Sequence, residues 1–353
     1  MPLSPRRFFL QLASIMALLP LTACAASPDQ PSGTSAQAAP LQAPRPPQIA
    51  AAGQVDFDTW LRQFRRDAIA EGIRPATLDA ALSGVAPIPR VIELDRRQPE
   101  TTLTFEEYLD RVVSEQRRAA ARQRFEENRT LLEEVGRRFG VQPRFIVALW
   151  GIETDFGRLS GTYPVIAALA TLAYDGRRSS FFRHELINAL KIVDRYGIDP
   201  RRMMGSWAGA MGQSQFMPSS FLNFAVSYRG DAPPDIWTKR EDVFASIANY
   251  LARSGWHGEE TWGREVKIPG GFDTGLVGLA QRRTLAQWTA AGVRRMDGGT
   301  LPDRGLTASL VQPGGASGPT FLVYDNYRVI LKWNNSSYFA TAVGFLADSI
   351  EAP

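Results

Sequence analysis

The chain has 353 residues, of which 44% are hydrophobic and 22% are charged, so it is long enough to bury a large core. Its formal net charge is +4, which falls to +2 if the arginines at positions 6 and 7 are removed with a leader. This weak positive charge slightly favours binding to an acidic wall polymer, but it gives no reason to expect a nucleic-acid partner. The single cysteine, Cys24, excludes an intramolecular disulfide bond.

The N-terminus has the pattern of a secretory signal. Arg6 and Arg7 precede an apolar run over residues 8–21 that is too short for a membrane span. Residues 21–24, Leu-Thr-Ala-Cys, then have the form of a lipobox, in which the leader is removed and the new N-terminal cysteine is acylated. We expect a lipoprotein signal peptide over residues 1–23 and lipidation of Cys24. The alternative is an ordinary cleaved signal with an incidental cysteine.

The residues after Cys24 predict an anchored protein on a long tether. Ala25 and Ala26 include no aspartate that would retain it at the inner membrane, so we expect a periplasmic protein anchored in the inner leaflet of the outer membrane. Residues 24–55 are rich in Ala, Pro, Gln and Ser and lack the apolar residues of a core. At roughly 3 Å per residue, such a linker carries a folded domain tens of ångströms from the membrane.

Residues 56–353 form the predicted folded region, and most of it has helical periodicity. Asp56 is placed to cap a first helix. Thr104 and Glu107 form a capping box before a long polar helix that carries Tyr108. Residues 180–196 repeat apolar side chains at helical spacing, which predicts a further helix.

Strand patterns occur late in the chain. Alternating or branched apolar residues predict strands at residues 262–268, 306–312, 320–324 and 328–332, with a short helix at 284–291 among them. We therefore expect a mainly α, α+β fold, with a helical N-terminal part, a helical core and a small β-containing insertion over about residues 262–331.

Glu153 is a candidate proton donor. It ends the apolar helical run of residues 145–153, and Ile146, Leu149 and Trp150 lie on roughly the same side of that helix. Apolar neighbours disfavour the charged form of a carboxyl group, so we expect a raised pKa for Glu153. The alternative is a solvated carboxylate at a helix end.

A second segment, residues 205–221, has a composition suited to binding a carbohydrate. It mixes three glycines, two glutamines and several hydroxyl groups with aromatic residues. Glycine permits close approach of the backbone, amides and hydroxyls supply hydrogen bonds, and aromatic rings stack on sugars. The alternative is a packing segment of small residues.

These two segments and several further motifs resemble the lytic murein transglycosylases of the B type, bacterial enzymes that cut the glycan of peptidoglycan. The resemblance extends from about residue 57 to residue 350. It implies a lysozyme-like core, no cofactor, peptidoglycan strands as the partner and cell-wall synthases as candidate protein partners. Its motifs in chain order are residues 148–157, 169–172, 177–178, 205–221, 247–251, 255–256, 333–337 and 340–343.

The resemblance implies catalysis by one carboxyl group, although glycoside cleavage usually employs two. Glu153 would protonate the oxygen between N-acetylmuramic acid and N-acetylglucosamine while the acetamido group of the substrate stabilises C1. The Glu153 carboxylate would then accept the proton of the muramyl C6 hydroxyl as this attacks C1, which gives a 1,6-anhydromuramyl end. Asp155 is the nearest candidate for a second carboxylate. It follows Glu153 by two residues at the end of a helix, so its side chain is expected to point away from Glu153.

The resemblance also implies roles for residues around Glu153. Ser206 is implied as an orienting hydrogen-bond partner of the catalytic carboxyl group. Arg177 and Arg178, which by themselves read as a surface pair, are implied to lie beside the glycan, where a guanidinium fork suits a lactyl or peptide carboxylate. Trp333 and Phe339 replace tyrosines of the family pattern, so stacking is expected there without the hydroxyl hydrogen bonds. The remaining implied glycan-binding residues are Tyr108, Gln215, Ser220, Tyr250 and Asn334.

No metal site is expected. Some relatives carry a calcium-binding loop where this chain has residues 227–237, but Arg229 and two prolines replace oxygen donors there, and only Asp231 and Asp235 remain. His184 lies in a helical pattern and His257 in a glycine-flanked turn, so we expect neither to be a ligand.

Two other functions stay open. A water-using muramidase would share Glu153 and the glycan-binding residues, and a non-catalytic wall-binding lipoprotein would need no acid at this position.

Overall fold

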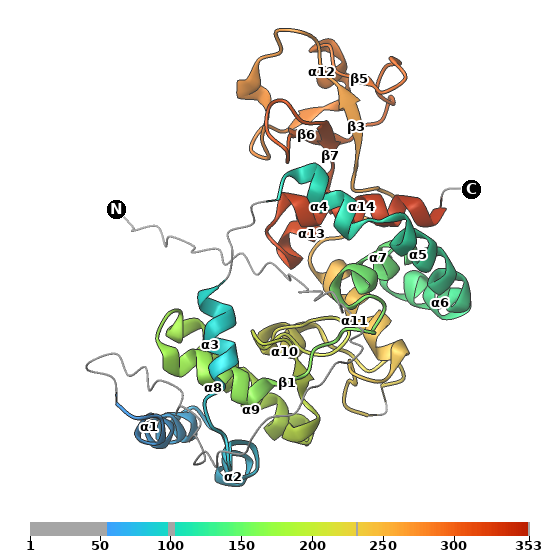
Figure 1. Cartoon of the computed structure of the whole chain (residues 1–353). Helices are drawn as coiled ribbons and strands as arrows, with labels where there is room; N and C mark the ends of the chain where they lie inside the picture. Colours follow the sequence, from blue (N-terminus) through green and yellow to red (C-terminus); the bar gives the residue numbers. More distant parts are fainter. Residues whose placement is uncertain (1–54, 98–102, 231, 352–353) are drawn as a thin grey trace, which may run out of the picture.

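The computed structural model describes residues 55–97, 103–230 and 232–351 (Figure 1). The predicted signal peptide, Cys24 and almost all of the predicted linker lie outside the described residues. No helix in the described part of the chain is long and apolar enough to cross a membrane.

The described residues are mainly helical, as predicted. The helices are α1 (Phe57–Ala70), α2 (Pro75–Leu82), α3 (Pro89–Arg96), α4 (Phe105–Val112), α5 (Glu115–Glu127), α6 (Arg129–Phe139), α7 (Pro143–Thr154), α8 (Val165–Asp175), α9 (Ser179–Tyr196), α10 (Pro218–Phe224), α11 (Arg240–Arg253), α12 (Leu285–Ala290), α13 (Asp325–Trp333) and α14 (Ser337–Glu351).

The strands form two antiparallel groups. β1 (Tyr163–Pro164) pairs with β2 (Met204–Gly205), and a five-stranded sheet has the order β4-β6-β7-β3-β5. Its members are β3 (Gly263–Lys267), β4 (Arg283–Thr284), β5 (Arg294–Arg295), β6 (Thr307–Val311) and β7 (Thr320–Val323). We call residues 262–324 the β subdomain; it projects from the helices in Figure 1.

Two predicted helix starts are confirmed, and one predicted helix is wrong in length. The Asp56 carboxylate accepts the Thr59 amide at 2.9 Å and so caps α1. Thr104 and Glu107 form the capping box of α4. The long polar helix expected after Thr104 is in fact two helices, because Ser114 accepts the amide of the third residue of α5 and starts a new helix.

The predicted strand at residues 328–332 is also wrong, because this stretch belongs to α13. Its buried residues are Asn326, Tyr327, Val329 and Ile330, which recur at helical spacing. The strand was predicted from the branched residues of the segment. Val329 and Ile330 are buried on the same side as Asn326 and Tyr327, and only a helix brings residues at this spacing to one side. This difference matters because α13 carries Trp333 at its end.

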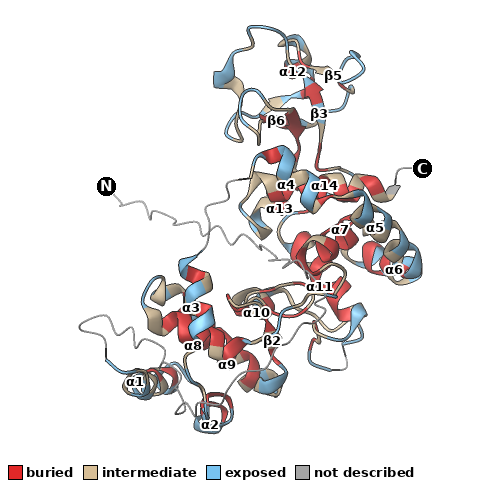
Figure 2. Cartoon of the chain, viewed as in Figure 1, coloured by how far each residue is buried: buried red, intermediate tan, exposed pale blue. Residues whose placement is uncertain are grey.

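Two hydrophobic cores hold these elements together. The larger core lies among the helices, where α7 packs against α5, α11 and α14, and α8 packs against α9. The smaller core lies in the β subdomain around Trp288 and Leu310. Figure 2 shows α7 as buried over most of its length, while α5 and α6 have exposed faces. A carboxyl group near the end of α7 is therefore held in apolar surroundings.

Candidate active site

Glu153 lies in the last turn of α7 and is only 6% exposed. Burial raises its pKa to about 7, although a hydrogen bond from Trp333 opposes the shift. The indole Nε1–H of Trp333 donates to Glu153 Oε1 at 2.7 Å. Glu153 thus has the raised pKa expected from the sequence, together with a hydrogen-bond donor that the sequence did not reveal.

Trp333 ends α13 and is held among aromatic rings. Its indole lies 4.7 Å from the ring of Tyr250 and 5.3 Å from the ring of Phe216, measured between centroids. Tyr250 is 8% exposed, and its hydroxyl donates to the Lys332 carbonyl at 2.7 Å. Burial raises the pKa of Tyr250 to about 12, so it stays a neutral phenol. The structure therefore brings together Glu153, Trp333 and Tyr250.

Tyr108 reaches the same region from α4. Burial, with a smaller contribution from the charge of Glu153, raises its pKa to about 12. Its ring lies 5.5 Å from that of Tyr338, a half-buried residue that sequence reasoning did not select. The neighbouring Phe339 is 3% exposed and leaves little ring surface for a sugar. Ser337 starts α14, and adjacent residues of a helix point their side chains to different sides. The helical register could therefore have indicated that Tyr338 and Phe339 do not share one side.

Gln213 joins the 205–221 segment to α7. Its side-chain oxygen accepts from Trp150 Nε1 at 2.9 Å, and its Nε2 donates to the Trp237 carbonyl at 2.8 Å. Its main-chain carbonyl accepts from Thr154 Oγ1 at 2.9 Å. These bonds fix the end of the helix next to Glu153. The segment contains two glutamines, Gln213 and Gln215, and the sequence does not indicate which of them bonds to α7.

The Asp155 carboxylate pairs with two arginines beyond the end of α7. Asp155 follows α7 in the left-handed region, with φ of 50°, and Phe156 has φ of 60°. The Asp155 carboxylate accepts from Arg158 Nε at 2.7 Å and lies 3.6 Å from Arg117 Nε. The carboxylate nearest to Glu153 in the sequence is therefore paired with two arginines.

Ser206 makes its own hydrogen bonds within a tight turn. Its Oγ accepts the Ala210 amide at 3.1 Å, and its amide donates to the Ala210 carbonyl at 2.8 Å. In the described part of the chain, no hydrogen bond joins Ser206 to Glu153. The orienting role implied by the family stays a prediction, and it requires a contact that forms on substrate binding.

The other polar residues predicted to bind glycan are half-buried. Gln215 has φ of 49°, and its Nε2 donates to the carbonyls of Ser160 at 3.1 Å and Gly212 at 2.8 Å. Ser220 lies in α10, and Asn334 follows the last residue of α13. Their contacts with glycan stay predictions. His184 and His257 are both exposed.

Arg177 and Arg178 share one buried carboxylate. Arg177 Nε donates to Asp95 Oδ2 and Arg177 Nη2 to the Asp95 carbonyl, both at 2.7 Å, and Arg178 Nη2 donates to Asp95 Oδ1. Burial opposes ionisation, but these hydrogen bonds hold the pKa of Asp95 below its ordinary value. The Arg177 side chain remains 50% exposed. Sequence reasoning missed Asp95, because no motif surrounds it.

The stretch where some relatives bind calcium is closed by hydrogen bonds. Asp242 accepts the amides of Tyr228 at 2.7 Å and Asp235 at 2.9 Å, and Asp235 in turn accepts the Trp237 amide at 2.9 Å. Among the described residues, which do not include Asp231, no group of three His, Cys, Asp or Glu side chains is arranged to hold a metal. The expectation that this stretch binds no metal stays a prediction.

The chain is similar to known proteins in sequence and in fold. Residues 56–348 match the transglycosylase SLT domain. The membrane-bound lytic murein transglycosylase B of Escherichia coli is 32% identical over 225 residues, which are 60% of this chain and 58% of that protein.

Solved structures of lytic transglycosylases are similar to this chain in fold. SltB3 from Pseudomonas aeruginosa, in complex with NAG-anhNAM-pentapeptide, has a TM-score of 0.81 and 45% identity, covering 84% of this chain and 80% of that one. The Escherichia coli lytic transglycosylase Slt35, in complex with calcium, has a TM-score of 0.70 and 27% identity, covering 82% and 92%. The chain belongs to the transglycosylase SLT domain family and has the fold of the lytic murein transglycosylases.

Proposed function

We propose that this protein is a peptidoglycan lytic transglycosylase that cleaves the β-1,4 bond from N-acetylmuramic acid to N-acetylglucosamine and leaves 1,6-anhydromuramyl ends. The observation that carries the proposal is the buried Glu153, whose raised pKa makes it both a proton donor and a proton acceptor near neutral pH. SltB3, the relative described above, was solved in complex with NAG-anhNAM-pentapeptide, which supports an anhydro product.

In the first step, protonated Glu153 gives its proton to the glycosidic oxygen, and the bond between this oxygen and muramyl C1 breaks. The acetamido carbonyl oxygen of the same sugar stabilises the positive charge at C1. No second carboxylate is required for this step, which agrees with the pairing of Asp155 to Arg117 and Arg158. General acid–base catalysis of this kind supplies about 10²- to 10⁴-fold of the rate.

In the second step, the Glu153 carboxylate accepts the proton of the muramyl C6 hydroxyl while O6 bonds to C1. Glu153 is thereby returned to its protonated form, and no water is consumed. An intramolecular hydroxyl held in this way has an effective molarity of up to about 10⁵ M or more, so it outcompetes water.

The test is mass analysis of fragments released from purified peptidoglycan in isotope-labelled water. We expect unlabelled 1,6-anhydromuramyl ends. Labelled reducing ends would instead identify a water-using muramidase, and binding without release of fragments would identify a wall-binding protein without catalytic activity.

We further propose that the signal peptide over residues 1–23 is removed, that lipidated Cys24 anchors the protein to the outer membrane, and that residues 24–55 connect the anchor to a catalytic region over residues 56–353. The E. coli relative is itself named as membrane-bound. Cys24→Ala is expected to release the protein from the membrane fraction. Continued membrane association of this variant would refute the lipid anchor.

A further inference from the structure

The indole Nε1–H of Trp333 donates a hydrogen bond to Glu153 Oε1 at 2.7 Å. We propose that Trp333 is a positioning residue that holds Glu153 Oε1 and leaves Oε2 to carry the proton delivered to the substrate. This inference rests on the proposed function for its catalytic meaning. The hydrogen bond itself is testable without any turnover.

The chemistry of the indole group supports this assignment. An indole N–H donates a hydrogen bond and cannot accept one, unlike the hydroxyl of serine or tyrosine. A hydroxyl partner can accept the proton of a neutral carboxyl group and turn it away from the substrate. Trp333 cannot accept this proton, so the acidic O–H of Glu153 is left free to point toward the glycosidic oxygen.

The same hydrogen bond favours the base form of Glu153. A donor stabilises a carboxylate more than a neutral acid, so it opposes the effect of burial on the pKa of Glu153. The proposed reaction needs both forms in succession, first the acid and then the carboxylate. Without the indole donor, the carboxylate formed after the first step would be less stable, and it would be held less firmly for the second.

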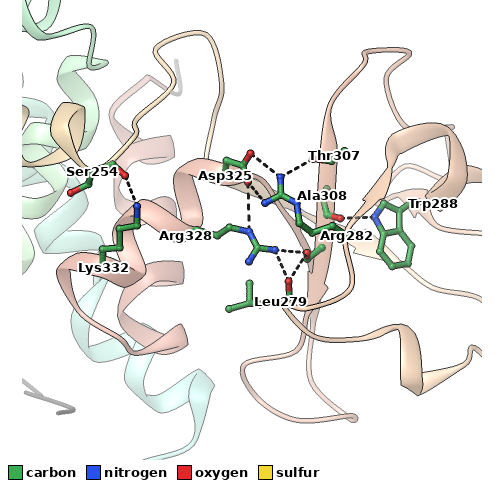
Figure 3. Close-up of polar contacts among 10 residues, drawn as sticks. Ser254, Leu279, Arg282, Trp288, Thr307, Ala308, Asp325, Arg328 and Lys332 are labelled. Carbon is green, nitrogen blue, oxygen red and sulfur yellow. Dashed lines mark hydrogen bonds and ion pairs between the residues drawn. The ribbon is translucent and has the colours of Figure 1, made fainter. Parts of the chain in front are cut away.

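The indole is held by contacts at the end of α13. The Tyr250 hydroxyl donates to the Lys332 carbonyl at 2.7 Å, and its ring packs against the indole of Trp333. Lys332 Nζ donates to the Ser254 carbonyl at 2.6 Å, as Figure 3 shows. These bonds tie the last turn of α13 to the end of α11, so the direction of the Trp333 N–H is fixed.

The beginning of α13 is held equally firmly to the β subdomain (Figure 3). Arg282 donates to both oxygens of the Asp325 carboxylate, at 2.7 and 2.9 Å. Arg328 Nη2 donates to the Leu279 carbonyl at 2.6 Å and to Ser309 Oγ at 2.7 Å. A helix bonded at both ends leaves little freedom for Trp333 to move away from Glu153.

The other ionisable groups near Glu153 do not account for its protonation behaviour. Tyr108 from α4 and Tyr250 from α11 each have a pKa raised by burial to about 12, so both stay neutral. The phenol of Tyr338 approaches from α14 through its contact with Tyr108. Arg117 from α5 pairs with Asp155. Burial and the Trp333 hydrogen bond are therefore the two influences on Glu153 to be tested.

The test compares Trp333→Phe with the parent in the absence of substrate. Carbon-13 labelling of glutamate allows NMR titration of the Glu153 carboxyl group. Trp333→Phe removes the N–H but keeps an aromatic ring, and we expect it to raise the pKa of Glu153 by about one unit. Trp288→Phe is the matched control, because it removes an indole hydrogen bond of 3.0 Å to the Ala308 carbonyl inside the β subdomain. This control is expected to leave the titration of Glu153 unchanged.

A second measurement uses the unaltered protein, in case Trp333→Phe fails to fold. The Nε1–H resonance of Trp333 in nitrogen-15 spectra should shift with pH at the same midpoint as the Glu153 carboxyl group. An unchanged or lowered pKa in folded Trp333→Phe, or an indole resonance that ignores the Glu153 titration, would overturn the inference. Because neither titration involves substrate, both outcomes are independent of whether peptidoglycan is cleaved.

Turnover supplies the catalytic readout. The alkaline limb of the pH profile of kcat/KM should move upward with the pKa of Glu153 in Trp333→Phe. Turnover should fall about tenfold at the pH optimum of the parent, since the carboxylate is less well placed for the second step. A fall in turnover without any displacement of the pH profile would reduce Trp333 to a packing residue.

Discussion

Asp95 bridges Arg177 and Arg178: one carboxylate oxygen accepts from Arg177 Nε at 2.7 Å and the other accepts from Arg178 Nη2. The carboxylate is almost fully buried, with 2% of its side chain exposed, while half of the Arg177 side chain faces solvent. Two positive charges share one negative charge, so the pair keeps a net positive charge that can meet an anionic group of the substrate.

Asp95→Asn is expected to weaken both the fold and the binding of glycan that carries stem peptides, because the Asp95 carboxylate holds both guanidinium groups in place. Removal of one partner from a buried ion pair costs about 3 to 5 kcal/mol, and the exposure of Arg177 places this case near or below the lower end of that range. KM for glycan with stem peptides should rise severalfold, while KM for glycan without peptides stays near that of the parent. Thermal melts and kinetics on both substrates provide the measurements.

Arg96→Gln is the matched control for this variant. It removes the nearby ion pair from Arg96 to Asp175, in which the arginine side chain is 46% exposed, so the expected loss of stability is below about 1 kcal/mol. Equal effects of Asp95→Asn on both glycan substrates would contradict a role in peptide recognition.

Ser206→Ala tests the orienting role that the family implies. If Ser206 bonds to Glu153 in the substrate complex, loss of its hydroxyl costs about 1 to 3 kcal/mol and should lower turnover roughly tenfold to a hundredfold, with little change in KM. Ser214→Ala is the control, because Ser214 Oγ is fully buried and finds no hydrogen-bond partner among the residues that the structure describes. The control should keep turnover and stability. If Ser206→Ala changed only the melting temperature, its hydroxyl would serve the turn with Ala210 alone.

The 227–237 loop is expected to be stable without calcium. Asp242 and Asp235 already accept main-chain amides there, so no cation is needed to satisfy them. The melting temperature should stay the same within error after treatment with EDTA and after addition of calcium. A rise of several degrees with calcium would show that the loop binds the ion. Asp242→Asn should lower the melting temperature under either condition.

The ionisation of Glu153 should also appear in stability. An acid whose pKa is raised from 4.5 to about 7 on folding stabilises the fold fully below about pH 4.5, and this contribution is lost as the pH rises to about 7. Glu153→Gln keeps an acceptor for Trp333 and cannot ionise. Its free energy of unfolding relative to the parent should therefore increase by about 3 kcal/mol between pH 4 and pH 8. A difference that is constant over this range would contradict the raised pKa.

The raised pKa of Glu153 could be predicted from the sequence, because the burial of this residue follows from local information. Glu153 ends an apolar run within one helix, so the pKa shift could be expected from neighbours on the same turns. Trp333 lies 180 residues away along the chain, directly after a segment that was predicted as a strand. Which side chain meets Glu153 depends on the packing of α13 on α11, which no local pattern specifies.

Asp95 and Gln213 were missed for a related reason. Each acts through partners on other elements, so neither has a spacing that reveals it. The predicted strands at residues 262–268, 306–312 and 320–324 were confirmed by β3, β6 and β7. Short runs rich in branched or aromatic apolar residues, bounded by Gly and Pro, are a local pattern typical of strands. The strand at 328–332 failed because branched residues also suit the buried side of a short helix, and tertiary packing decided between the two.

Cleavage of purified peptidoglycan by Glu153→Gln tests the central claim most directly. Glutamine keeps the shape and the acceptor for Trp333 but can neither donate nor accept the catalytic proton, so we expect an intact fold, retained glycan binding and no detectable release of 1,6-anhydromuramyl fragments. Asp155→Asn, its control two residues away, should keep turnover within tenfold of the parent. Turnover of Glu153→Gln within tenfold of the parent would contradict the assignment of Glu153 as the single acid and base.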